Sequence, residues 1–199
     1  MNENQSGSYW LLTRILTMRW TYAAPAAALV VSAGGAHAVQ YLSIEQAQAR
    51  LVPAAAAWKA QDLLLSETQR QAVAQASGTR PRDAHVRAWA ARDAQGAVLG
   101  RMLVDEVIGK HDLITYAVAI GADERVIGIE ILDYRENYGG QIRETNWRAQ
   151  FRGKGSRDAL HVDQDIANIS GATLSCTHVT DGVRRLLAIN DLVLKTLPG

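Results

Sequence analysis

The sequence has one cysteine, almost no net charge and no long run of strongly apolar residues, and each absence excludes a class of protein. Cys176 alone cannot form an internal disulfide, and one thiol is too few for a cysteine-ligated iron–sulfur cluster. The CxxCH pattern of a c-type haem is missing as well. Any redox chemistry must therefore use an organic cofactor or a metal that is held by other ligands.

The charge balance argues against a nucleic-acid partner. The chain of 199 residues has 21 lysines and arginines against 20 acidic residues, a formal net charge of +1. Proteins that bind a phosphate backbone concentrate an excess of Lys and Arg, and no basic tract is visible here. We therefore expect no nucleic-acid partner, and the histidines are too scattered to indicate a metal site.

Much of the apolar character of the N-terminal region lies in residues 23–38, which read AAPAAALVVSAGGAHA. The run is too short and too rich in Gly and Ala for a membrane-spanning helix, which needs about 20 apolar residues. Arg14 and Arg19 precede it, and Ala36-His37-Ala38 matches a signal-peptidase site. Residues 1–38 are therefore predicted to be a signal peptide.

Two details of this prediction stay open. Met18 is an alternative start, because a signal that begins there has a more typical length. Cleavage after Ala38 would release a periplasmic protein that begins at Val39. The alternative is an uncleaved N-terminal segment that anchors the protein to the inner membrane.

Residues 39–85 are predicted to be a mainly helical N-terminal segment. Ser43 and Gln46 have the spacing of a capping box, and apolar residues follow at helical intervals. Ser66 and Gln69 repeat the signal before a second helix. Pro53 interrupts the chain between them.

From Val86 onward the pattern is typical of β-strands, with alternating residues and short turns rich in Gly and Asp. The predicted fold class is α+β, an antiparallel sheet of about four or more strands covered on one face by helices. The expected strands are 86–91, 98–107, 113–120 and 125–134. A short helix over 145–151, a polar linker over 152–165 and an amphipathic helix over 179–194 complete the domain at 86–199.

The segment 170–177 places four hydroxyl residues among small ones just ahead of the last predicted helix. Small residues let the backbone approach a bulky ligand, and a helix N-terminus favours an anion such as phosphate. A hydroxyl-rich helix cap, which needs only one of these side chains, explains the same composition. The residues alone leave both interpretations open.

The sequence Ser170-Gly171-Ala172-Thr173, followed by Leu174-Ser175, resembles the S/T-G-A-T-x-S/T flavinylation motif of the FMN-binding domain family. That family includes the covalent-FMN subunits of the sodium-translocating NADH:quinone reductase and of the Rnf complex. The resemblance implies that Thr173 is esterified to the phosphate of FMN, which makes the chain a phosphoprotein. The implied partner is a magnesium-dependent flavin transferase that uses FAD as donor.

Other parts of the chain resemble the family in the same order. Residues 126–132 resemble the strand before its flavin loop, and residues 136–140 stand where that loop is expected. Residues 147–154 resemble the pattern W-x-x-Q-F-x-G-K. The chain departs from the family at Ala167, where an aspartate is usual, and in the loop sequence ENYGG, where the respiratory subunits have ETPG.

The resemblance implies a set of cofactor-binding residues and a function. Around the phosphate at Thr173 the expected residues are Ser170, Gly171, Ala172, Ser175 and Thr177, and near the ring or ribityl chain they are Glu136, Tyr138 and Gly139. The implied function is an exported flavoprotein that relays electrons between a membrane redox protein and another acceptor, which favours an electron carrier or redox-complex subunit over a stand-alone enzyme. The alternative is an exported binding or assembly module of the same fold with noncovalent or no flavin.

Overall fold

The computed structural model describes residues 39–136 and 139–197. The predicted signal peptide, its cleavage site and Tyr138 lie outside the described residues.

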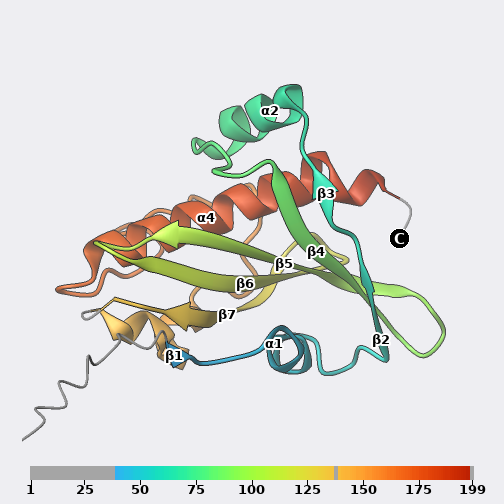
Figure 1. Ribbon diagram of the computed structural model, residues 1–199, viewed down its shortest axis with the longest axis horizontal. Helices are drawn as coiled ribbons and strands as arrows, with labels where there is room; N and C mark the ends of the chain where they lie inside the picture. Colours follow the sequence, from blue (N-terminus) through green and yellow to red (C-terminus); the bar gives the residue numbers. More distant parts are fainter. Residues whose placement is uncertain (1–38, 137–138, 198–199) are drawn as a thin grey trace, which may run out of the picture. The chain divides into compact units, whose positions relative to one another are not determined.

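The described residues contain one antiparallel sheet, as the sequence predicted (Figure 1). Its order is β1-β7-β6-β5-β4-β2, and the short β3 also pairs with β4. The four long strands form the expected meander, each pairing with the next along the chain. The strands are β1 (Val39–Gln40), β2 (Ala57–Ala60), β3 (Leu63–Leu64), β4 (His85–Arg92), β5 (Val98–Ile108), β6 (Leu113–Gly121) and β7 (Val126–Tyr134).

Helices begin where the capping signals predicted them in the first half of the chain. Ser43 and Ser66 each accept a hydrogen bond from the backbone three residues on, and Gln46 and Gln69 return one. Gly78 ends the second helix in the left-handed conformation. The α-helices are α1 (Ile44–Leu51), α2 (Glu67–Ser77), α3 (Thr145–Ala149) and α4 (Thr173–Leu192), and the 3-10 helices are η1 (Gly140–Arg143) and η2 (Leu194–Thr196).

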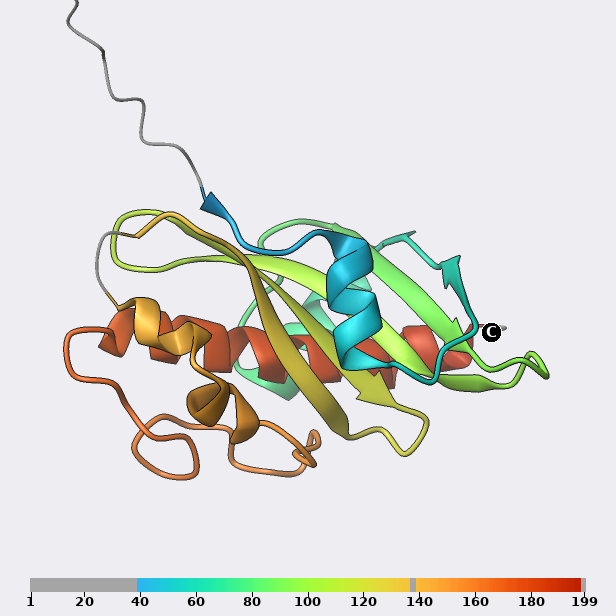
Figure 2. The same ribbon diagram turned by 90° about the horizontal axis from the view of Figure 1, so that it is seen from below.

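Helices lie on both faces of the sheet, whereas the strand pattern predicted cover on one face. Successive side chains of a strand point to opposite faces, and β5 shows this alternation. Leu103 packs in the larger core cluster with α4, whereas Met102 and Val104 pack in a second cluster with α1. The α4 helix runs along one face and α1 lies across the other (Figures 1 and 2).

The N-terminal segment contributes to the same sheet as the later strands. Besides the two expected helices it forms β1, which pairs with β7, and β2 and β3, which pair with β4. The sequence did not predict these three strands. The expected boundary between residues 85 and 86 falls inside β4.

The last helix begins at Thr173, six residues before the predicted start at Val179. It buries most of the predicted apolar face, including Val179, Val183 and Leu187.

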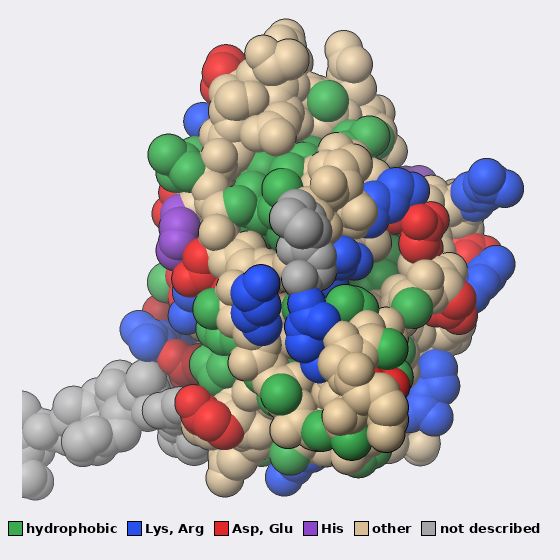
Figure 3. Space-filling view, turned by 90° about the vertical axis from the view of Figure 1, so that its right-hand side faces the viewer, with side chains coloured by type: hydrophobic (Ala, Val, Ile, Leu, Met, Phe, Trp, Pro, Cys, Tyr) green, Lys and Arg blue, Asp and Glu red, His purple; other side chains and the backbone are tan. Residues whose placement is uncertain are grey.

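None of the helices within 39–136 and 139–197 is both long enough and apolar enough to cross a membrane. On the face in Figure 3, acidic and basic side chains are interspersed among apolar ones.

Candidate functional site

The N-terminus of α4 lacks a side-chain cap. Its N-cap residue is Ala172, and no side-chain hydrogen bond caps the helix. Cys176 donates its backbone N–H to Ala172, but the N–H groups of Thr173, Leu174 and Ser175 donate to no group in the described part of the chain. The hydroxyls of the segment are therefore not used as a helix cap, and three aligned donors stay available to an anion.

A cavity of about 250 Å³ lies at this helix end and includes the predicted acceptor residue. The Thr173 side chain is exposed, so an enzyme that modifies it has access. The residues that line the cavity are Lys110, Glu136, Gly171, Ala172, Thr173, Leu174 and Ser175. The β5–β6 turn, the segment after β7 and the start of α4 therefore meet at one place.

Glu136 binds the β5–β6 turn. One of its carboxylate oxygens accepts the backbone N–H of His111 at 2.5 Å and that of Asp112 at 3.0 Å. Burial raises the pKa of Glu136, but backbone hydrogen bonds from Asp112, His111 and Lys110 outweigh it, and the pKa lies below the ordinary value. Gly109 leaves room for the carboxylate, because a Cβ there would lie 2.5 Å from its oxygen.

The loop after Glu136 packs tightly against the start of α4. Gly139 has φ +80°, and a Cβ there would lie 2.7 Å from the Ala172 Cβ and 2.9 Å from the Tyr134 hydroxyl. Burial raises the pKa of Tyr134, and the Ser175 side chain beside its phenol lowers it by less. The end of β7, the loop at Gly139 and the residue before the exposed Thr173 are thereby packed together.

The W-x-x-Q-F-x-G-K residues hold the segment that precedes Ser170. The Trp147 indole donates to the carbonyl of Ala167 at 2.8 Å, and the Gln150 side chain accepts the N–H of the same residue at 2.7 Å. Trp147 is buried in the core and packs edge-to-face on Phe151, so it does not line the cavity. Where the family usually has an aspartate, this chain therefore fixes Ala167 through its backbone.

Lys154 of the same pattern holds the polar linker. Its ammonium forms an ion pair with Asp165 at 2.9 Å, and that carboxylate also accepts the backbone N–H groups of Leu160 and His161. Burial raises the pKa of Asp165, but the hydrogen bonds from His161, Lys154 and Leu160 lower it further than burial raises it. The linker between α3 and α4 is therefore ordered by its own contacts.

The structure brings together most of the residues that the resemblance implied. Glu136, Gly171, Ala172, Thr173 and Ser175 line the cavity, and Gly139 packs against it. Ser170 is exposed beside the cavity, and Thr177 lies one turn further along α4; neither lines it.

The sequence did not indicate Leu174 or Tyr134 as residues of the site, and it indicated 109–111, which contains Lys110, only as a turn that could line the cofactor pocket. The composition of residues 109–111 indicated the pocket only weakly, because it marks a turn without showing which loop the turn faces.

Cys176 is fully buried, and burial raises the pKa of its thiol, which agrees with its interpretation as a small core residue.

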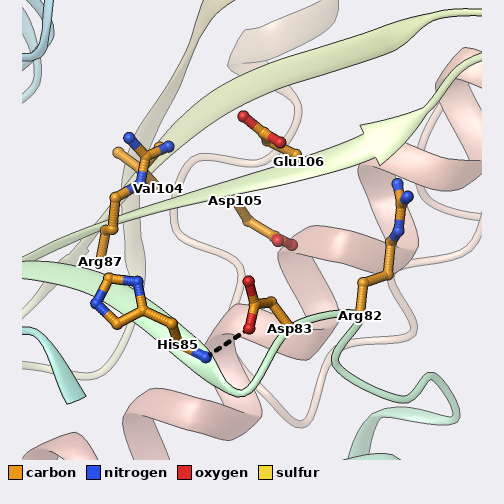
Figure 4. A pocket seen from close by; sticks show the side chains of 7 residues that line it. All are labelled: Arg82, Asp83, His85, Arg87, Val104, Asp105 and Glu106. Atoms are coloured by element: carbon orange, nitrogen blue, oxygen red, sulfur yellow. Dashed lines mark hydrogen bonds between the residues drawn. The ribbon is translucent and has the colours of Figure 1, made fainter. Parts of the chain in front are cut away.

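A larger cavity of about 380 Å³ is lined by residues of β4, of β5 and of the segment before β4, away from the motif (Figure 4). Its walls carry three cationic or imidazole side chains, Arg82, His85 and Arg87, and three carboxylates, Asp83, Asp105 and Glu106. The backbone N–H of His85 donates to Asp83 at 3.0 Å. The mixed charges give this cavity no preference for an anion, so the smaller cavity at α4 is the candidate site.

The residues at the α4 cavity fit the phosphate end of FMN. Three N–H groups without a partner in the described part of the chain, the positive end of a 20-residue helix and one lysine converge there. The cavity is smaller than the roughly 300–1,000 Å³ of pockets that enclose a whole small molecule. It therefore suits the phosphate and the adjoining ribityl chain better than the whole cofactor.

The family comparison agrees with this assignment. Residues 109–188 match the family model of the FMN-binding domain. Among solved structures, the crystal structure of Shewanella oneidensis NqrC matches with 16% sequence identity and a TM-score of 0.47, covering 70% of this chain and 80% of that one. No curated protein matches the chain. The residues that match the FMN-binding domain model, 109–188, include the cavity and Thr173.

Proposed function

We propose that the protein carries FMN in phosphoester linkage to Thr173 and serves as an exported electron carrier. The observation that carries the proposal is the position of Thr173. It is the first residue of α4, it is exposed and in the predicted motif, and its own backbone supplies one of the three available N–H groups. A phosphate on its hydroxyl would lie at the positive end of the helix.

The attachment is a transfer of the FMN half of FAD. The Thr173 oxygen attacks the phosphorus atom on the FMN side, the pyrophosphate bond breaks, and AMP leaves. The hydroxyl proton passes to a base of the transferase or to water. A hydroxyl suits this role because the phosphoester is stable, whereas a carboxylate would form a labile anhydride.

The chain supplies orientation and electrostatics, and the flavin supplies the ability to accept one or two electrons. A phosphoester on the tail leaves the ring chemically unaltered and keeps the cofactor from being lost outside the cytoplasm. With the predicted signal peptide, this supports a periplasmic carrier between a membrane redox protein and another acceptor. An inner-membrane anchor at residues 1–38 would serve the same relay.

Coexpression with a magnesium-dependent flavin transferase tests the linkage. Intact-mass measurement of the parent protein should show one FMN-sized adduct, and Thr173→Ala should lack it. Thr68→Ala is the matched control, because it removes an exposed hydroxyl from α2, outside the motif, and should keep the adduct. The parent expressed without the transferase should be empty.

Two results would count against the proposal. A parent protein that stays unmodified in the presence of an active transferase would refute the covalent linkage. Flavin that copurifies with the parent and is released by denaturation would show noncovalent binding instead.

A further inference from the structure

Lys110 is a cationic side chain at the wall of the site that the motif residues leave unexplained. It lines the same cavity as Thr173, although 63 positions of the chain separate them. Its side chain is exposed and forms no ion pair with any described residue. A charged ammonium without an acidic partner, beside a helix N-terminus, is suited to bind an anion.

The turn that carries Lys110 is held by Glu136. The Glu136 carboxylate accepts the N–H groups of His111 and Asp112, and the Gly109 N–H donates to the Asp112 carbonyl at 2.8 Å. These bonds close the turn around the carboxylate. The negative charge of Glu136 is thereby directed at backbone donors.

Gly109 makes the arrangement sterically feasible. A Cβ at this position would lie 2.5 Å from the Glu136 oxygen and 2.9 Å from its Cγ. Real Cβ atoms do not approach other atoms so closely, so any side chain here would displace the carboxylate. The chain of contacts therefore runs from Gly109 through Glu136 to the backbone of the turn and so to Lys110.

We propose that the Lys110 ammonium binds the phosphate carried by Thr173, and that Glu136 is a positioning residue that acts on this phosphate through the turn of Lys110. The proposal rests on the proposed function, because it needs FMN at Thr173. The α4 N–H groups contact the phosphate from one side and Lys110 neutralises its charge from the other. Glu136 itself then does not touch the flavin.

Amine labelling of empty and flavin-loaded protein tests the contact directly. Acetylation of each lysine is followed by peptide mass spectrometry before and after loading by the transferase. We expect several-fold slower labelling of Lys110 after loading. Lys59, exposed on the edge strand β2, should label at an unchanged rate and is the internal reference.

Three variants separate a phosphate contact from shielding by the ring. In loaded protein, Lys110→Met should shift the phosphorus NMR signal of the phosphoester, and Lys59→Met should leave it in place. Loading of Lys110→Met should be slower by about threefold to tenfold, since a partly exposed charge contact is weaker than a buried one. Lys110→Arg should restore most of the rate.

The role of Glu136 is tested by a double-mutant cycle with Glu136→Gln and Lys110→Met. If Glu136 acts through Lys110, the double variant should load little more slowly than Lys110→Met alone. Multiplicative effects would show that Glu136 acts independently and would overturn its positioning role. Thermal unfolding of each variant identifies any that fails to fold.

The failure of this inference and that of the proposed function are distinguishable. If the parent loads flavin but Lys110 labels equally fast before and after loading, the phosphate contact is wrong and the linkage at Thr173 stands. If the parent never loads in the presence of an active transferase, the proposed function is wrong, and this inference is refuted with it.

Discussion

Gly139 lies so close to Ala172 that a Cβ on the glycine would be 2.7 Å from the Cβ of the alanine. The contact joins the loop after β7 to the residue before Thr173. It requires both a glycine and a left-handed backbone, since φ at Gly139 is +80°.

Gly139→Ala should therefore destabilise the protein more than a comparable change elsewhere. Gly96, in the β4–β5 turn, is the matched control, because it has φ +86° and a Cβ added there would meet no atom within 4 Å. We expect Gly96→Ala to cost about 1 kcal/mol from backbone strain and Gly139→Ala about 2–4 kcal/mol from strain plus crowding. Urea unfolding measures both, and equal losses would contradict the tight packing.

Gln150→Leu should slow flavin loading although residue 150 does not line the cavity. The side chain accepts the N–H of Ala167 and donates to the Trp147 carbonyl, so both contacts are lost together. We expect the free energy of unfolding to fall by about 1–3 kcal/mol. We also expect the transferase to attach flavin more slowly, although Thr173 itself is unchanged. Gln95→Leu, at an exposed position of the β4–β5 turn, is the control and should load like the parent.

Asp165→Asn should change how stability depends on pH. The pKa of Asp165 is lowered in the folded protein, so its contribution is present above the ordinary aspartate pKa of about 3.9 and is lost as pH falls through the lower folded pKa. The variant should therefore be less stable than the parent at pH 7, with the difference shrinking in acid. Unfolding free energies between pH 7 and acid measure it, and a pH-independent difference would contradict the assignment.

Arg185→Leu should be among the more destabilising substitutions in α4. Arg185 is 5% exposed and pairs with Asp105, which also accepts the Tyr116 hydroxyl at 2.9 Å. Removing the guanidinium leaves a partly buried carboxylate without its cation, at a cost of about 3 kcal/mol. Arg157→Leu, on the exposed linker, is the control, and a similar melting temperature for both variants would show that the buried pair contributes little.

The sequence predicted the features that depend on local patterns. The capping boxes at Ser43 and Ser66 need only residues three apart, and the four long strands follow from alternation and turn chemistry. Both were confirmed within a residue or two at most strand ends. The short strands β1 to β3 were missed because a segment of two to four residues is too short to show the alternation of apolar and polar residues that indicates a strand. Each of them also pairs with a strand that lies further along the chain.

The candidate site was only partly visible in the sequence for a similar reason. The motif around Thr173 indicated a phosphate-binding site. Hydroxyl and glycine residues favour caps and turns, however, so the sequence did not predict that α4 already begins at Thr173. Lys110 could not be assigned because its approach to α4 depends on the turn held by Glu136. The W-x-x-Q-F-x-G-K residues were noticed, but only the structure shows that they fix Ala167 and Asp165.

Peptide mass spectrometry of the protein loaded by the transferase tests the central claim most directly. We expect the peptide that contains Ser170 to Thr177 to carry one FMN-sized adduct, with fragment ions that place it on Thr173. An unmodified peptide despite an active transferase, or an adduct on Ser170 or Ser175, would contradict the assignment.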